Sequence, residues 1–134
     1  WEGTDVTVGE ELLRPSGIYT PTVLKILEQN SIKAIAHITG GGLPGNVNRV
    51  LPDNMDAQIH KEMWSAPRIF TEIQSLGNID EDEMFKVFNM GIGMVLIVDQ
   101  QSVDSTQEII DSTGISSTQI GTVKANGTGS VQIV

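Results

Sequence analysis

The segment His37-Ile38-Thr39-Gly40-Gly41-Gly42 holds the residues whose types and spacing point most directly to ligand binding. Glycine has no Cβ, so a run of three lets the backbone turn sharply and come close to a ligand. The start of a helix adds unpaired N–H groups and the positive end of the helix dipole, and both attract an anion. The segment therefore predicts an anion-binding turn, and phosphate is the group expected there.

Two elements must position this turn. An apolar run over residues 32–38 predicts a strand before it, and apolar residues spaced i, i+4, i+7 and i+8 over residues 43–51 predict a helix after it. Glycines between a strand and a helix also serve backbone geometry alone, and this structural alternative stays open. Gly40, Gly42 and Gly45 fit the dinucleotide pattern too, but the chain is too short for the two halves of that fold.

The two histidines do not predict a metal site. They lack cysteine partners and the paired spacing of zinc motifs, so we expect no bound metal. His37 precedes the glycines, where its ring could bind a ligand or fix the turn, and His60 is expected to be solvated. The acidic residues 80–83 fit the first turn of a helix. The sequence contains no triad signature or Walker lysine, so no catalytic residue is assigned.

The bulk composition predicts one globular domain. The 134 residues are 39% hydrophobic and 19% charged, which is ordinary for a soluble protein. A net charge of −9 argues against binding to nucleic acid or to acidic membranes. No apolar run can span a bilayer, and the absence of cysteine is compatible with the cytoplasm, where we expect the protein. The first residue is not Met, and we interpret residues 1–8 as a linker remnant before a domain over residues 9–134.

Further local signals predict the remaining elements. We expect a helix that begins with Thr20 as its cap, buries Val23, Leu24 and Leu27, and ends at Asn30-Ser31. The unbroken apolar run 94–98 predicts a central strand buried on both faces. Other expected elements are a short strand over 56–60, helices over 65–76 (stopped by Gly77) and 102–113, a helix with Asp80 and Glu83 as its capping box, and strands over 118–124 and 130–134 joined by a turn over 125–129.

The glycine segment resembles the His-Ile-Thr-Gly-Gly-Gly motif of the phosphoribosylformylglycinamidine cyclo-ligase family, also called aminoimidazole ribonucleotide synthetase. Two further blocks agree with that family in order and separation, namely residues 9–19 (GEELLRPSGIY) and 88–94 (FNMGIGM). The similarity runs from Val8 to Val123 and covers only the family's C-terminal domain. It implies an α+β fold in which helices cover a mixed β-sheet.

The resemblance also implies a reaction. Family members close the imidazole ring of 5-aminoimidazole ribonucleotide from formylglycinamidine ribonucleotide in purine biosynthesis, and they consume ATP. ATP and Mg²⁺ would be bound mainly by an N-terminal domain that this chain lacks, so we expect the chain alone to be inactive. The expected partners are that domain, the nucleotide substrate and a second subunit in a homodimer.

Site residues follow from the same resemblance. Substrate or phosphate binding is expected at Gly40, Gly41 and Gly42 with His37 and Thr39, while Tyr19 and Asn89 would line the cleft. The block before Tyr19 departs from the family pattern. This chain has Ser16 and Gly17 where the family commonly has Thr and a basic residue, and whether Arg14 replaces that residue stays open.

Two alternatives remain. The chain could come from another ATP-using member of the same superfamily, of the selenophosphate synthetase or thiamine-monophosphate kinase type. It could also be a non-catalytic ligand-binding module, which would consume no ATP even when joined to its missing half.

Overall fold

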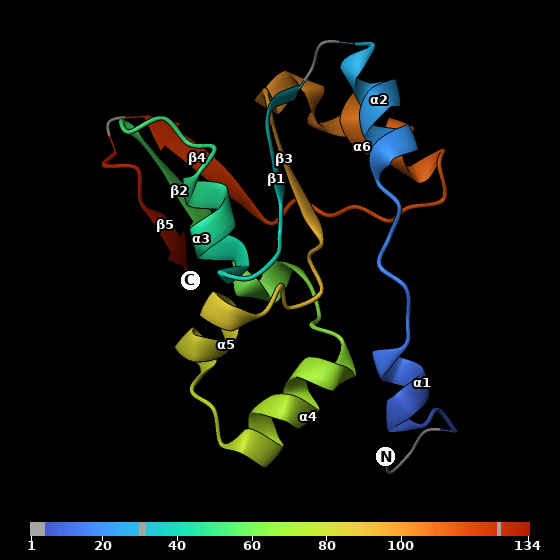
Figure 1. Cartoon of the computed structure of the whole chain (residues 1–134). Helices are drawn as coiled ribbons and strands as arrows, with labels where there is room; N and C mark the ends of the chain where they lie inside the picture. Colours follow the sequence, from blue (N-terminus) through green and yellow to red (C-terminus); the bar gives the residue numbers. More distant parts are fainter. Residues whose placement is uncertain (1–4, 30–31, 126) are drawn as a thin grey trace.

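The computed structural model describes residues 5–29, 32–125 and 127–134 of the chain (Figure 1). The elements are α1 (Val8–Leu12), α2 (Thr20–Leu27), β1 (Ile32–His37), α3 (Gly42–Asn48), β2 (Met55–Ile59), α4 (Arg68–Gly77), α5 (Glu81–Val87), β3 (Met94–Val98), α6 (Val103–Asp111), β4 (Gly121–Ala125) and β5 (Val131–Ile133), with 3₁₀ turns at Lys61–Met63 and Gln100–Ser102. The predicted α+β class is confirmed.

The strands form two separate sheets. β1 and β3 pair antiparallel, with His37 opposite Met94 and an irregularity in register between Ile32 and Ala34. The other sheet has the order β4-β2-β5, in which β2 is antiparallel to β4 and parallel to β5. In Figure 1 the β1–β3 pair runs between this three-stranded sheet on one side and α2 with α6 on the other.

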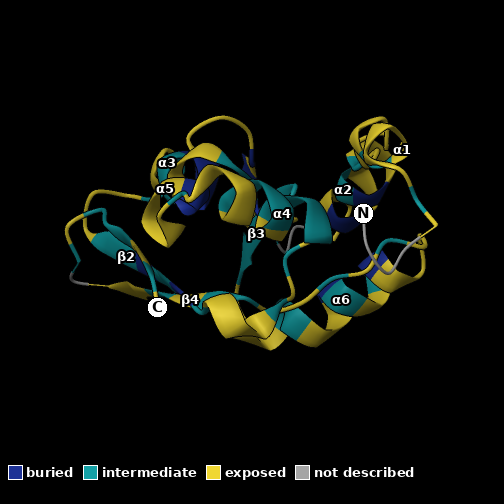
Figure 2. Cartoon of the chain, turned by 90° about the horizontal axis from the view of Figure 1, so that it is seen from below, coloured by how far each residue is buried: buried dark blue, intermediate teal, exposed yellow. Residues whose placement is uncertain are grey.

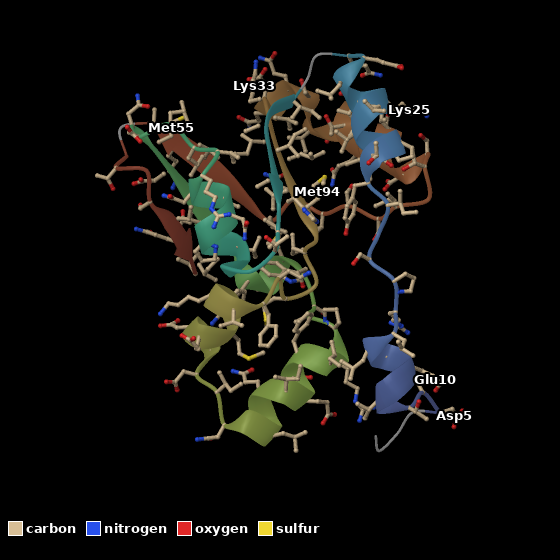
Figure 3. The ribbon with its side chains drawn as sticks, in the orientation of Figure 1. Asp5, Glu10, Lys25, Lys33, Met55 and Met94 are labelled. Atoms are coloured by element: carbon tan, nitrogen blue, oxygen red, sulfur yellow. The ribbon has the colours of Figure 1, made fainter. Side chains whose placement is uncertain are left out.

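The prediction that residues 94–98 form a central, doubly buried strand is wrong. Within the described residues β3 pairs only with β1, and all five of its residues are half-buried. One reason is that the strand borders a concave space, which leaves part of its apolar surface uncovered. Figure 3 shows Met94 at the start of this strand, in the middle of the molecule.

The last two strands lie where the sequence predicts them, but they do not pair with each other. Both flank β2, so the expected turn over residues 125–129 is a crossing between the two edges of one sheet. Asp56 on β2 holds this crossing, because its Oδ1 accepts hydrogen bonds at 2.8 Å from the backbone N–H groups of Thr128 and Ser130. Residue 126, within the predicted turn, lies outside the described residues.

The main core lies between α3, α5 and the sheets, where the buried segments of Figure 2 gather. Its buried members are apolar side chains from several elements: Ala36, Ile38, Leu43, Val47, Ala57, Ile59, Met84, Phe85 and Met90. The predicted helix over 43–51 supplies two of them, although α3 itself ends at Asn48. The core therefore lies directly beneath the glycine segment.

Helix α2 turns a different face inward from the one predicted. Thr22 and Ile26 are buried, whereas Leu24 and Leu27 are 57% and 41% exposed. Contact with α6 sets this orientation, because the Thr22 hydroxyl lies 2.8 Å from the Thr113 hydroxyl just after α6. The cap is Tyr19 rather than Thr20, and the expected helix end at Asn30-Ser31 lies outside the described residues.

Helix caps and ends also differ from prediction. The Asp80 backbone caps α5 as expected, but its side chain makes no capping hydrogen bond, so the predicted capping box is wrong. A capping box is found instead at α1, between Thr7 and Glu10, in a segment where no helix is predicted. Helix α4 is stopped by Asn78 in the left-handed conformation, one residue after Gly77. Among the described helices, none has the length and apolar character needed to cross a membrane.

Candidate functional site at the glycine turn

The three sequence blocks that resemble the cyclo-ligase family meet in space at Gly93. The backbone N–H of Ile38, from the glycine block, donates to the Gly93 carbonyl at 3.0 Å. A Cβ at Gly93 would lie only 2.0 Å from the Tyr19 hydroxyl, so a side chain there would displace Tyr19. Segments 19, 38 and 93 are thus packed against one another although they are far apart in the sequence.

The glycines of the turn are constrained to different degrees. Gly41 has a φ of 99°, a left-handed conformation that strongly favours glycine. Gly42 has a φ of 59° and is buried, and a Cβ there would lie 1.8 Å from the Phe85 carbonyl oxygen. Gly40 is exposed, and no atom beyond its chain neighbours lies within 4 Å of its Cβ position. Backbone geometry therefore explains Gly41 and Gly42 but leaves Gly40 unexplained.

Asn46 is a polar residue of this site that the sequence reasoning missed. It is 5% exposed, and its side-chain Nδ2 donates to the carbonyls of Gly42 at 2.8 Å, Thr39 at 3.2 Å and Gly40 at 3.3 Å. The available signal was a carboxamide four residues after Gly42, which is one helical turn later and between the core residues Leu43 and Val47. A polar side chain on a buried helix face needs hydrogen-bond partners, and here the turn supplies them.

Hydrogen-bond donors surround the turn. The Thr39 hydroxyl and the Arg49 guanidinium each donate to Asn46 Oδ1 at 3.4 Å, which is a long hydrogen bond. The backbone N–H groups of Gly40 and Gly41 donate to no acceptor among the described residues. The turn therefore presents two backbone amides without a described acceptor, which is a suitable environment for an anion.

The other predicted site residues occupy different positions around this turn. His37 is exposed at the end of β1, and its ring makes no hydrogen bond or ion pair with a described residue. Asn89 is half-buried and uses its Oδ1 to accept from the Gly91 backbone N–H at 3.0 Å, so one part of its carboxamide shapes its own loop. Arg14 forms an ion pair with Glu11, in which Nη1 lies 3.4 Å from Oε1.

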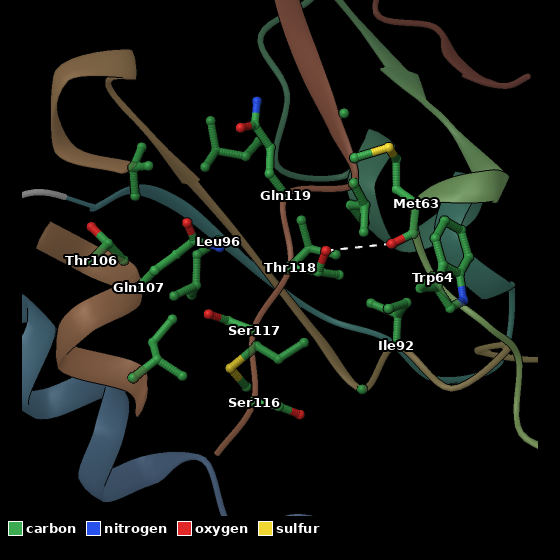
Figure 4. A pocket seen from close by; sticks show the side chains of 18 of the residues that line it. Met63, Trp64, Ile92, Leu96, Thr106, Gln107, Ser116, Ser117, Thr118 and Gln119 are labelled. Carbon is green, nitrogen blue, oxygen red and sulfur yellow. Dashed lines mark hydrogen bonds between the residues drawn. The ribbon is translucent and has the colours of Figure 1, made fainter. Parts of the chain in front are cut away.

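Tyr19 faces a different space from the glycine turn. It lines a concave region of about 1290 Å³ together with β3 and the segment after α6, part of which is drawn in Figure 4. His37, Thr39, the three glycines of the turn and Asn89 do not line this region. The structure thus groups His37 and Thr39 with the glycines, and it connects Tyr19 to them only through Gly93 and Ile38.

The described residues include no cluster of three or more His, Asp or Glu side chains that could hold a metal ion. His60 Nδ1 lies 3.4 Å from Glu62 Oε1 on the surface, away from the turn. This region therefore provides hydrogen-bond donors and one guanidinium rather than a set of metal ligands.

Comparison with known sequences identifies relatives over almost the whole chain. The chain is 46% identical over 131 residues to the phosphoribosylformylglycinamidine cyclo-ligase of Caldicellulosiruptor bescii, covering 98% of this chain and 38% of that protein. It is 41% identical over 133 residues to the enzyme of the same name from Alkaliphilus metalliredigens, covering 99% of this chain and 38% of that protein. The chain therefore spans well under half the length of these relatives.

Solved structures share the fold at lower sequence identity. The hydrogenase maturation protein HypE of E. coli superposes with a TM-score of 0.63 and 18% identity, covering 87% of this chain and 35% of that chain. A chain in the HypE–HypF complex gives a TM-score of 0.64 and 21% identity, covering 93% of this chain and 43% of that chain. At this identity the likeness establishes the fold alone.

The model of one protein family, described as "AIR synthase related protein, C-terminal domain", matches residues 1–134. This match covers all three blocks that meet at Gly93. The chain belongs to the AIR synthase related protein family, as its C-terminal domain.

Proposed function

We propose that the chain is the C-terminal domain of a phosphoribosylformylglycinamidine cyclo-ligase that acts in de novo purine biosynthesis. The whole enzyme would close the imidazole ring of 5-aminoimidazole ribonucleotide from formylglycinamidine ribonucleotide with the consumption of ATP. The observation that carries the site assignment is the pair of backbone amides at Gly40 and Gly41, which are exposed and donate to no acceptor among the described residues.

In this proposal the glycine turn binds the phosphate of the nucleotide substrate. The chain has a net charge of −9, so its overall field repels an anion and local donors must provide the attraction. The Gly40 and Gly41 N–H groups would do so, with His37 and Thr39 at the edge of the site. Tyr19 and Asn89 would line the cleft further from the phosphate.

Positioning would be the main contribution of this domain to the reaction. Ring closure requires that the two reacting ends of one linear molecule be held together, and a fixed phosphate anchor restricts the freedom of the substrate. ATP and Mg²⁺ would be bound mainly by the N-terminal domain, so no residue of this chain is assigned as a catalytic acid, base or nucleophile.

Exposed apolar side chains support the proposal that an N-terminal domain is the partner. Leu13 and Ile18 are 83% and 78% exposed, and Leu12 in α1 is 65% exposed. Figures 1 and 3 show α1, marked by Glu10, apart from the sheets. Exposed apolar side chains that lie close together in the chain are of the kind that an interaction surface covers. We assign residues 1–8 to the connection with that domain, and a cytoplasmic homodimer completes the proposal.

Turnover by the full-length protein tests this function. We expect ATP-dependent conversion of formylglycinamidine ribonucleotide to aminoimidazole ribonucleotide, with essentially no activity from residues 1–134 alone. Activity only with selenide or with thiamine monophosphate would assign the protein to another branch of the superfamily. A full-length protein that consumes no ATP with any of these substrates would indicate a non-catalytic ligand-binding module.

A further inference from the structure

The peptide groups of the glycine turn have a fixed direction, and one side chain accounts for it. Asn46 Nδ2 donates to the carbonyls of Thr39 and Gly40, the two peptides that precede Gly40 N–H and Gly41 N–H. In a trans peptide the C=O and N–H bonds point in opposite directions. Because both carbonyls point toward Asn46, both N–H groups point away from it.

The third carbonyl fixes the inner end of the turn. Asn46 Nδ2 lies 2.8 Å from the Gly42 carbonyl, the shortest of its three contacts. Gly42 is itself held against Phe85, since a Cβ there would overlap the Phe85 carbonyl oxygen. Asn46 is therefore tied to a part of the turn that has little room to move, and it transfers that constraint to Gly40 and Gly41.

The acceptor side of the carboxamide contributes a second constraint. Asn46 Oδ1 receives the Thr39 hydroxyl and the Arg49 guanidinium, each at 3.4 Å. This assigns the amide orientation, because only an oxygen can accept from the Arg49 cation. One buried carboxamide thus lies within hydrogen-bond distance of three carbonyls, which share the two hydrogens of its nitrogen, and its oxygen accepts from a hydroxyl and a cation.

We infer that Asn46 is the positioning residue of the anion site: it does not touch the substrate, but it aims the Gly40 and Gly41 amides at the phosphate. This inference rests on the proposed function, in which the turn binds the phosphate of the nucleotide. A preorganised set of donors binds an anion more tightly than a mobile set, because no ordering is required at binding.

The test uses Asn46→Asp in the full-length enzyme. Aspartate has the same shape but no N–H donor, so it would repel the three carbonyls and the turn would lose its fixed peptide direction. The Michaelis constant for formylglycinamidine ribonucleotide is expected to rise by at least about tenfold, while that for ATP changes by less than about twofold. A merely structural role would change both constants together.

Asn48→Asp is the matched control. Asn48 is on the same helix and adds the same charge when substituted, but its side chain donates to the Gly129 carbonyl rather than to the turn. For this variant we expect the Michaelis constant for formylglycinamidine ribonucleotide to rise by less than about twofold. Equal effects of the two substitutions would mean that added charge alone is responsible, and this would overturn the inference.

Asn46→Ser provides a neutral variant in case the aspartate variant does not fold. Serine keeps one hydroxyl donor, so it can hold at most one of the three carbonyls, and its affinity for the nucleotide should lie between those of the wild type and the aspartate variant. If the Michaelis constant for formylglycinamidine ribonucleotide were unchanged in Asn46→Ser or in Asn46→Asp, the positioning role would be overturned.

A titration with inorganic phosphate distinguishes a failure of the positioning role of Asn46 from a failure of the proposed phosphate site itself. In the wild-type enzyme, phosphate is expected to shift the amide NMR signals of Gly40 and Gly41, and in Asn46→Asp it should leave them unshifted while the remaining spectrum is retained. If the wild-type signals do not respond to phosphate or to the nucleotide, the proposed phosphate site itself is wrong. If they respond equally in both proteins, only the role of Asn46 is wrong.

Discussion

Gly42 lies at the contact between the turn and the core. It is buried, its φ is 59°, and the Phe85 carbonyl oxygen occupies the place where a Cβ would be. Gly40 stands two residues earlier with open space around it. The same residue type thus serves packing at one position and leaves backbone accessible at the other, and substitution should separate these two roles.

Gly42→Ala is expected to destabilise the protein. The added methyl must displace the α5 backbone or change the φ of the residue, and overpacking of this kind typically costs about 1–3 kcal/mol. Chemical denaturation should show a lower free energy of unfolding. Gly45→Ala is the control, because the Gly45 Cβ position is open and alanine favours a helix. Equal stability of the two variants would contradict the described packing of Gly42.

At the scale of elements, the sequence predicts those helices and strands that are determined by residues close together in the chain. The apolar run before the glycines predicted β1, and the spacing of Leu43 and Val47 predicted α3. The inward face of α2 could not be predicted in the same way. Leu24 and Leu27 are apolar yet exposed, because the position of α6 and not the composition of α2 decides which face is covered.

The pairing of strands that are far apart in the chain could not be predicted from the sequence either. Nothing in residues 94–98 indicates that β3 pairs with one strand among the described residues, and nothing in the last two strands indicates that both flank β2. At the site, the glycines and their exposed amides could be predicted from a short motif. Asn46 could not be assigned to them with certainty, because its three carbonyl contacts exist only once the turn is folded.

The crossing between β4 and β5 gives an element-scale prediction with a pH dependence. Hydrogen bonds from the backbone of Thr128, and then of Ser130, hold the pKa of the Asp56 carboxyl below its usual value. A carboxyl whose pKa is lowered by folding adds stability above its unfolded pKa, and this stability is lost as the pH falls through the folded pKa.

Asp56→Ala should therefore lower the thermal unfolding midpoint at pH 7, and the difference from wild type should shrink as the pH falls below about 4. Thermal unfolding followed by circular dichroism over a pH series measures this. A difference that stays constant down to the lowest pH would show that the ionised carboxylate does not hold the crossing.

At the scale of the whole molecule, the chain combines a packed core with exposed apolar side chains on its surface. Figure 2 shows α1 largely exposed, and Leu13 and Ile18 between α1 and α2 are among the most exposed apolar residues described. The relatives are longer than this chain, which spans 38% of the Caldicellulosiruptor bescii enzyme. In the proposed enzyme, a phosphate anchor on this domain and ATP bound on an N-terminal domain would place the reacting groups between two domains.

The most direct measurement compares Gly40→Ala with Gly45→Ala in the full-length enzyme, because both positions accept a methyl without overlap and only Gly40 lies in the turn. A Gly40 methyl would project into the space where the phosphate should lie. We predict that Gly40→Ala raises the Michaelis constant for formylglycinamidine ribonucleotide by about tenfold or more without loss of stability, while Gly45→Ala leaves it unchanged. A Gly40→Ala enzyme that binds the nucleotide as tightly as wild type would contradict the account.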